Sequence, residues 1–189
     1  TQPINLDPTK QRIFCWSDIH WGHKNIIKYT NRPFKSVQQM NEQLIENYLN
    51  VVNENDVVIF GGDIGFMSEK NLNLILDCLP GYKILIVGNH DMHRDGTLYK
   101  LNFNEQHLCL AVHINTDLFE YDLLFTHYPL SKIPKGCICV HGHTHDKVVP
   151  NSKKHINMCV EHTNYTPREL TSIIEQGNKL INEENTYIS

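Results

Sequence analysis

Short apolar runs alternate with longer amphipathic segments along this chain. Runs of strand length occupy residues 13–16, 57–60, 84–87, 108–113, 121–125, 137–140 and 156–160. Apolar residues at helical spacing predict helices over 37–52 and 72–79, the second ending at Pro80-Gly81. A last helix is predicted to begin near Thr166, with Thr166 as N-cap and Pro167 in the first helical position. This alternation predicts an α/β fold with helices covering a sheet.

The overall composition predicts one ordinary globular domain over residues 1–189, without repeats or low-complexity tracts. No apolar run is long enough for a membrane span, and the N-terminal residues lack a signal-peptide pattern. The six cysteines lack CxxC spacing and are predicted to be buried free thiols, which indicates a reducing compartment. We therefore expect a cytoplasmic location and no membrane partner. The formal net charge of −4 argues against broad nucleic-acid binding.

Polar side chains with metal-binding capacity directly follow five of the predicted strands. These side chains are Asp18 and His20 after 13–16, Asp63 after 57–60, Asn89, His90 and Asp91 after 84–87, His127 after 121–125, and His143 and His145 after 137–140. Sites in α/β sheets lie beyond the carboxyl ends of strands. We expect these groups to meet at one end of the sheet, because five unrelated coincidences are a poor alternative explanation.

The spacing of these residues suits metal ions. Asp18 and His20 are two residues apart, and in extended backbone such side chains point the same way. His143 and His145 repeat this spacing, while Asp63 follows two glycines and has two oxygens that could bridge two ions. Imidazole, carboxylate and amide ligands suit Mn²⁺, Fe, Zn²⁺, Ni²⁺ or Co²⁺. The set is too rich in nitrogen for a pure Mg²⁺ or Ca²⁺ site.

The order of these motifs resembles that of the calcineurin-like metallophosphoesterase family. The matching motifs are Asp18-x-His20, Gly62-Asp63, Gly88-Asn89-His90-Asp91, His127 and Gly142-His143-x-His145, and the resemblance covers about residues 12–160. The compact chain looks like the small, single-domain members from bacteria and phages. The resemblance implies a two-sheet β-sandwich flanked by helices.

The resemblance also implies a centre of two divalent ions, with Mn²⁺ as the first candidate. One ion would take Asp18, His20, Asp63 and His145, and the other Asp63, Asn89, His127 and His143. Two ions roughly 3.5–4 Å apart clamp a phosphate and lower the pKa of a bridging water, so that hydroxide attacks phosphorus in line. His90 looks like the family's general acid toward the leaving group.

One position departs from the family pattern. Many members carry a second acid three residues after the bridging aspartate, where it orients the catalytic histidine, and Phe66 stands at that position here. Asp91, next to His90, either replaces this acid as a catalytic residue or caps a helix that begins there. The residues alone leave both possibilities open.

Groups that contact the substrate are predicted less directly. His23 resembles a recurring histidine of small family members, and Arg32 lies in a basic segment that could receive phosphate oxygens. Trp21 and Tyr128 flank predicted ligands and could line a pocket for a base or sugar. The other histidines, including His141, are expected to be structural.

The predicted function is hydrolysis of a small phosphate ester, with a phosphodiester or nucleotide favoured over a phosphomonoester. An inactive binding module on the same scaffold is disfavoured, because all seven predicted ligands and His90 are present. A structural zinc protein would need thiolate-rich sites, which the sequence lacks. The sequence does not indicate an oligomeric state.

Overall fold

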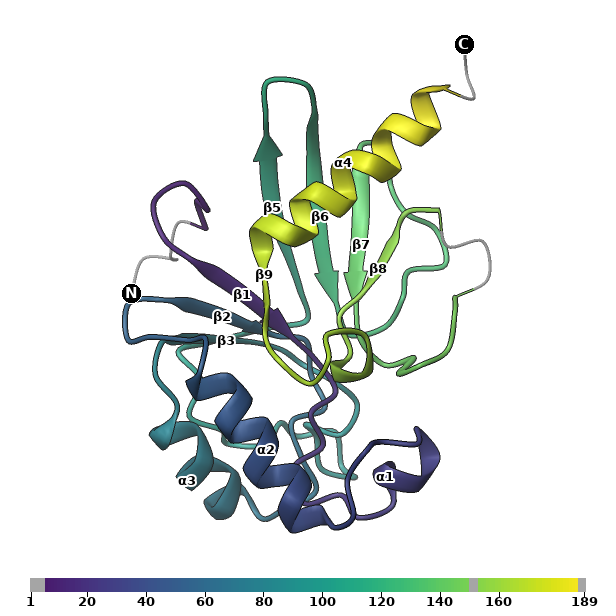
Figure 1. Cartoon of the computed structure of the whole chain (residues 1–189). Coiled ribbons are helices and arrows are strands. Elements are labelled where there is room, and N and C mark those ends of the chain that lie inside the picture. Colours follow the sequence, from purple (N-terminus) through teal and green to yellow (C-terminus); the bar gives the residue numbers. More distant parts are fainter. Residues whose placement is uncertain (1–5, 150–152, 187–189) are drawn as a thin grey trace.

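The structure is a computed structural model that describes residues 6–149 and 153–186, arranged as two sheets with flanking helices (Figure 1). The first sheet has the order β4-β3-β2-β1-β9 and contains β1 (Ile13–Trp16), β2 (Val57–Phe60), β3 (Tyr82–Ile86), β4 (Glu105–His107) and β9 (Arg168–Glu169). The second has the order β5-β6-β7-β8 and contains β5 (Cys109–Asn115), β6 (Glu120–Thr126), β7 (Cys137–His141) and β8 (His155–Asn157). The helices are α1 (Ile26–Tyr29), α2 (Val37–Leu49), α3 (Glu69–Cys78), the 3₁₀ turn η1 (Val160–His162) and α4 (Leu170–Thr186). This architecture confirms the predicted two-sheet fold.

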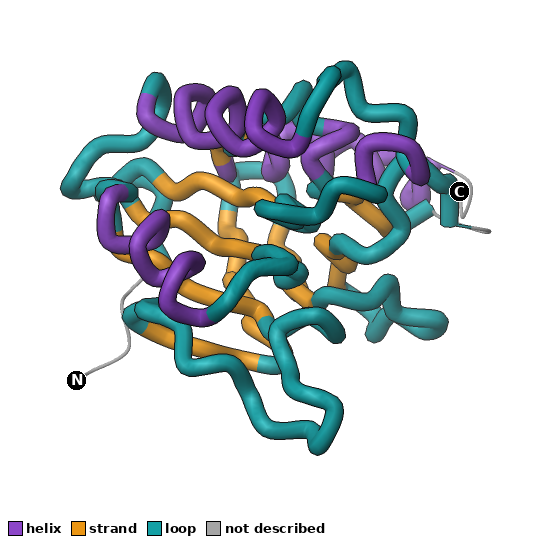
Figure 2. Tube along the Cα trace, turned by 90° about the horizontal axis from the view of Figure 1, so that it is seen from below, coloured by secondary structure: helices purple, strands orange, loops and turns teal. Residues whose placement is uncertain are grey.

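The first sheet is buried on both faces. Alternate side chains of β1 enter different hydrophobic clusters: Phe14 and Trp16 pack with α2 and α3, whereas Ile13 and Cys15 pack with the second sheet and α4. Figure 2 shows the helices along the outside of the strands. Strands that are covered on both faces have no polar side. β1 and β2 are therefore continuous apolar runs, and this pattern predicted both strands from the sequence.

Strand direction brings five strand ends to one region of the molecule. β1, β2 and β3 pair in parallel, and so do β6 and β7. The backbone also joins these strand ends: the Ser17 carbonyl accepts from Val160 N across the two sheets, and the His127 carbonyl accepts from Gly142 N within the second sheet, both at 3.0 Å. The loops that carry the predicted ligands therefore leave the sheets at the same place.

Two helices begin where the sequence places a capping serine. Ser36 accepts a hydrogen bond from Gln39 N at 3.1 Å and precedes α2, and Ser68 accepts from Asn71 N at 3.3 Å and precedes α3. The buried faces of these helices repeat at helical spacing, with Met40, Leu44 and Tyr48 in α2 and Leu72 and Leu76 in α3. These faces cover one side of the first sheet and hold β1 to β3 in place.

The structure corrects three expectations about local features. The last helix begins at Leu170 instead of near Thr166, because Arg168 and Glu169 pair with β1 as the short strand β9. No helix begins at Asp91, because residues 91–104 form turns, bends and irregular segments. Four of the six cysteines are buried as expected, but Cys78 and Cys109 are exposed.

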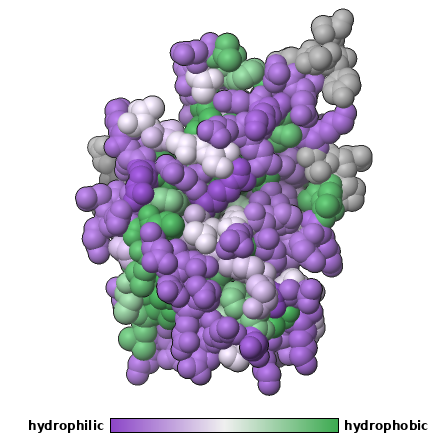
Figure 3. Space-filling model, in the orientation of Figure 1, coloured by the Kyte–Doolittle hydropathy of each residue, from purple (hydrophilic) through white to green (hydrophobic). Residues whose placement is uncertain are grey.

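The face seen in Figure 3 is mainly hydrophilic, and its apolar patches are most extensive along the left of the lower half. Among the residues that the structure describes, no helix is long and apolar enough to cross a membrane.

Candidate metal centre

The loops after β1, β2, β3, β6 and β7 bring the predicted metal ligands together. Three groups of potential ligands have their ligand atoms within 4.8 Å of one another: Asp18, His20 and Asp63; Asp63, His127 and His143; and Asp18, His145 and Cys159. Asp63 belongs to the first two. His20 Nε2 lies 3.7 Å from Asp63 Oδ2, while His127 Nε2 lies 3.5 Å from Asp63 Oδ1. The two oxygens of one carboxylate thus face two different ligand groups.

His145 and Asn89 extend these two groups. His145 Nε2 lies 3.8 Å from Asp18 Oδ1, and Asn89 Oδ1 lies 3.0 Å from His127 Nε2. Most of these separations are too long for hydrogen bonds. Ligand atoms that each lie about 2.1 Å from one ion are at most about 4.2 Å apart, so the separations suit shared ions.

The tautomers of two histidines favour metal binding. His127 Nδ1 lies 2.8 Å from the Gly61 carbonyl oxygen, which can only accept, and His145 Nδ1 lies 3.2 Å from Glu161 Oε1. When these rings are neutral, the proton is therefore on Nδ1, and the lone pair of Nε2 faces the ligand group. The short contact between His127 Nε2 and Asn89 Oδ1 then brings two hydrogen-bond acceptors together, and a cation bound to both would stabilise this arrangement.

Several buried polar atoms of this cluster lack a hydrogen-bond partner. They are Asp18 Oδ1 and both ring nitrogens of His20. Burying unpaired polar atoms is costly, and a divalent ion satisfies carboxylate and imidazole groups together. The donor set and its unpaired atoms fit a divalent metal centre.

Burial shifts the pKa values of two groups at the candidate metal centre. Burial and the neighbouring His145 and Arg32 lower the pKa of His20, which keeps the ring in the neutral form that binds metal. Burial and the charge of Asp18 raise the pKa of Asp63 to about 8. The protein without metal thus holds a proton on Asp63 that a bound cation would displace.

The backbone at the ligands differs from the extended conformation that we expected. Asp18, His20, Asp63, His143 and His145 all have left-handed φ angles, between 50° and 66°. Non-glycine residues in this region cost of order 1–3 kcal/mol each and persist where surrounding contacts impose them. Asp18 and His20 still converge on one group, whereas His143 and His145 serve different groups; both pairs are placed by tight left-handed turns and not by the alternation of a strand.

Glycines make room for these turns. Gly62 has a φ of 97°, and a Cβ at this residue would lie 2.7 Å from the Gly88 nitrogen and from His127 Nδ1. A Cβ at Gly142 would collide with Ser17 Oγ and Asp18 Oδ2. Any larger residue at these two positions would push the ligand loops apart.

Arg32 has a different position from the one predicted. It is 4% exposed, and its guanidinium donates to the backbone oxygens of Asp18 at 2.7 Å and Ile19 at 2.8 Å. The same guanidinium forms an ion pair with Glu161 at 2.8 Å. These contacts occupy Arg32 within the protein, which argues against the predicted contact with substrate phosphate.

Glu161 is a site residue that the sequence did not suggest. Its Oε1 accepts from both His145 Nδ1 and Arg32, so the pair holds His145 and the backbone of Asp18 together. Burial opposes ionisation of Glu161, but the hydrogen bond from His145 and the charge of Arg32 lower its pKa to about 2. The distance along the chain between Glu161 and the histidine motif matches no recognisable sequence pattern. The sequence therefore contains no signal that points to it.

Asp91 has neither of the two roles considered for it. Its Oδ2 accepts from the backbone nitrogens of Asp63 and Gly88, both at 2.8 Å, and its Oδ1 accepts from Ile64 N at 2.9 Å. With both oxygens occupied by backbone, Asp91 neither orients the His90 ring nor caps a helix. It ties the loop after β2 to the loop after β3, and we correct its assignment from catalytic to structural.

His90 lies beside the ligand groups but outside them. Its backbone nitrogen donates to Asp63 Oδ1 at 2.8 Å, and its side chain is 42% exposed. The centre of its ring lies 4.5 Å from that of Phe66, the residue at the position of the usual acid. His90 is thus accessible to a substrate next to the candidate metal centre.

The predicted pocket residues have separate positions. Trp21 is fully buried in the core, which corrects its proposed place in a pocket. Tyr128 is 51% exposed and its ring lies 4.3 Å from that of His143. His23 stacks on Phe66 with ring centres 4.0 Å apart.

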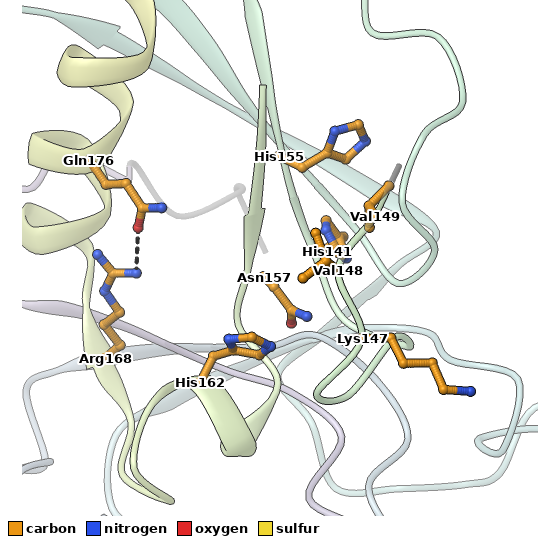
Figure 4. Close-up of a pocket in the computed structure, with 9 residues that line it drawn as sticks. All are labelled: His141, Lys147, Val148, Val149, His155, Asn157, His162, Arg168 and Gln176. Atoms are coloured by element: carbon orange, nitrogen blue, oxygen red, sulfur yellow. Dashed lines mark hydrogen bonds between the residues drawn. The ribbon is translucent and has the colours of Figure 1, made fainter. Parts of the chain in front are cut away.

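His141 lies apart from the two ligand groups. It is buried, its Nδ1 lies 2.8 Å from the Gly142 oxygen, and its ring meets that of His155. Figure 4 shows both histidines beside a separate cleft with Arg168 and Gln176 across from them. This position agrees with the structural role expected for His141.

Fold and site together define an α/β protein with a candidate divalent-metal centre. The sequence matches the family model described as calcineurin-like phosphoesterase over residues 11–185. An uncharacterized protein of Methanocaldococcus jannaschii, MJ1445, is 35% identical over 173 residues, which cover 87% of this chain and 90% of the relative. The Gene 66 protein of Mycobacterium phage L5 is 31% identical over 163 residues, which cover 70% and 77%.

A solved structure shares the fold. The crystal structure of the protein of unknown function AQ665 from Aquifex aeolicus matches with a TM-score of 0.65 and 26% identity, covering 88% of this chain and 99% of that chain. The chain belongs to the calcineurin-like phosphoesterase family, whose members bind divalent metals.

Substitution of Glu161 tests the support of the metal ligands. Glu161→Gln removes the charge that pairs with Arg32 and weakens the hydrogen bond to His145, and we expect about 10–100-fold lower affinity for Mn²⁺ by calorimetry. Asp56→Asn is the matched control, because Asp56 is buried and pairs with Arg12 away from the centre. The control should lower thermal stability and leave Mn²⁺ affinity intact; an equal loss of affinity in both variants would contradict this role of Glu161.

The raised pKa of Asp63 predicts how the stability of the metal-free protein depends on pH. Between the ordinary value of 3.8 and about 8, the folded state binds more protons than the unfolded state, so stability falls as pH rises through this window. Thermal midpoints in a chelator should therefore decline from pH 5 to 8.5 in the wild type and decline less in Asp63→Asn. Parallel curves for the two proteins would show that Asp63 does not carry this proton.

Proposed function

We propose that this protein hydrolyses a phosphate ester with two divalent ions, and that the substrate is a phosphodiester or nucleotide. The observation that supports this proposal is the position of Asp63, whose two oxygens face two separate ligand groups. Family membership indicates a hydrolase, and the donor set makes Mn²⁺ the first candidate among the divalent ions.

Each predicted ligand has a place in the proposed centre. One ion would be held by Asp18, His20, Asp63 and His145, and the other by Asp63, Asn89, His127 and His143. Such ions supply Lewis acidity toward a phosphate ester and lower the pKa of water when they are bound. The left-handed loops, Asp91 and the Arg32–Glu161 pair hold the side chains ready for this arrangement.

His90 is the proposed proton donor to the leaving group. Its ring is accessible and lies next to the centre, with Nε2 4.0 Å from Asp63 Oδ2. Burial lowers the pKa of His90 in the protein without ligands, so its proton-donating form depends on the negative charge that a phosphate brings. The proton would pass from the ring to the departing oxygen.

The activity test compares ester classes on one preparation loaded with Mn²⁺. The substrates are alkyl and aryl phosphomonoesters, the matching diesters, nucleotides and cyclic nucleotides. Faster hydrolysis of diesters or nucleotides supports the proposal, whereas exclusive hydrolysis of simple monoesters would make the protein a phosphatase with the same site. Bound metal without hydrolysis of any ester would favour a binding module.

Anomalous scattering from metal-soaked crystals tests the two ions, and a single ion that leaves Asp63 free would contradict the proposed centre.

Removing His90 should have an effect that depends on the leaving group. His90→Ala should keep both metals and lose about 10²–10⁴-fold in rate on alkyl or nucleoside esters, which leave as basic alkoxides. Nitrophenyl esters, which leave as stable anions, should lose far less. His93→Ala is the control, since His93 is similarly exposed and pairs with Glu69 instead of facing the centre. Equal losses on both kinds of ester would indicate that His90 holds the phosphate and does not donate a proton.

A further inference from the structure

A cleft of about 570 Å³ extends from the candidate metal centre toward α1. His20, His90 and His145 line its inner part, while Tyr29 and Lys147 belong to its outer walls. Its volume lies in the range of small-molecule sites. The space that continues past the metal ligands is available to whatever group is attached to a bound phosphate.

One wall of the cleft is made of aromatic rings. Phe66 stacks on His23 with ring centres 4.0 Å apart and an interplanar angle of 17°, and the His23 ring meets Tyr29 edge-on at 6.2 Å. Phe66 is 44% exposed and Tyr29 is 71% exposed, although both are large apolar side chains. Rings that stay exposed beside a candidate active site offer a surface on which a planar group can stack.

Polar groups complement this wall. Thr144, Asp146 and Lys147 follow the His143 position on the loop after β7, and all three line the same cleft. They provide a hydroxyl, a carboxylate and an ammonium group, which can bind hydroxyls and the polar edge of a heterocycle. Aromatic stacking together with hydrogen-bonding groups is the chemistry by which proteins bind nucleobases.

We propose that this cleft binds the nucleoside part of the substrate, with the base packed against the aromatic wall that Phe66, His23 and Tyr29 form. The inference rests on the proposed function, because it places the phosphate at the metal centre. It makes Phe66 a residue that determines specificity, at the position where the resemblance to the family implies an acid. An aliphatic ester would leave the aromatic wall uncovered and gain nothing from it.

Binding measurements test this proposal independently of turnover. Calorimetry on the Mn²⁺-loaded protein compares the non-hydrolysable methylenephosphonate analogues of adenosine 5′-monophosphate and ribose 5-phosphate, which differ by the base. Stacking on one aromatic side chain contributes about 1–3 kcal/mol per base, so the nucleotide should bind roughly 5–150-fold more tightly. Equal affinities in the wild type would overturn the proposal. Because no hydrolysis is measured, absence of activity would count against the proposed function alone.

Variants assign the effect to the ring. Phe66→Leu keeps an apolar side chain but should reduce the affinity ratio of the two ligands to near one, and Phe66→Tyr should restore it. Tyr128→Leu removes an exposed ring on the other side of the centre, beside His143, and should leave the ratio as in the wild type. Equal weakening of both ligands in Phe66→Leu would show instead that Phe66 acts by holding His90, which its ring contacts at 4.5 Å. If Phe66→Leu lacks native circular dichroism, Tyr29→Leu at the exposed end of the wall should still reduce the ratio, and an unchanged ratio there would overturn the proposal.

Discussion

The carboxylate of Asp63 is the constraint on which the site depends. It is 2% exposed and lies near a second buried carboxylate, Asp18, so two acidic groups share a buried region. Negative charges on such groups are stable only when cations or protons compensate them. His127 and His145, when neutral, present the lone pair of Nε2 to this region, since their Nδ1 atoms donate to other groups. The chemistry of the whole region therefore requires positive charge between the loops.

The geometry around this carboxylate is held by contacts that have no part in the chemistry. Asp91 joins the backbone of Asp63 to that of Gly88, and Arg32 with Glu161 joins the backbone of Asp18 to His145. Left-handed conformations at the ligand residues would relax without such contacts. The rigid double-faced sheet beneath them supplies the fixed strand ends from which these loops leave.

Much of the fold and of the ligand set follows from the sequence. Strands buried on both faces appear as unbroken apolar runs, and a parallel arrangement places the residues after such runs at one edge. Asp18, Asp63 and Asn89 could be recognised because each directly follows a strand, and the ordering of their motifs identified the family. The helix at Leu170 was placed too early, since the pairing of Arg168 with β1 is a long-range contact that local capping residues do not reveal.

Only the tertiary structure decided the roles of residues whose partners are distant in the chain. Arg32 and Glu161 are 129 residues apart, so the sequence did not reveal that they pair. The basic segment around Arg32 therefore suggested a contact with phosphate, whereas its guanidinium forms its hydrogen bonds inside the protein. The roles of Asp91 and Phe66 could not be predicted for the same reason. The groups that each one contacts belong to a different loop, and only the folded structure brings the two loops together. Local sequence determines which elements form and which side chains follow them; the direction in which a charged or aromatic side chain turns depends on neighbours that folding supplies.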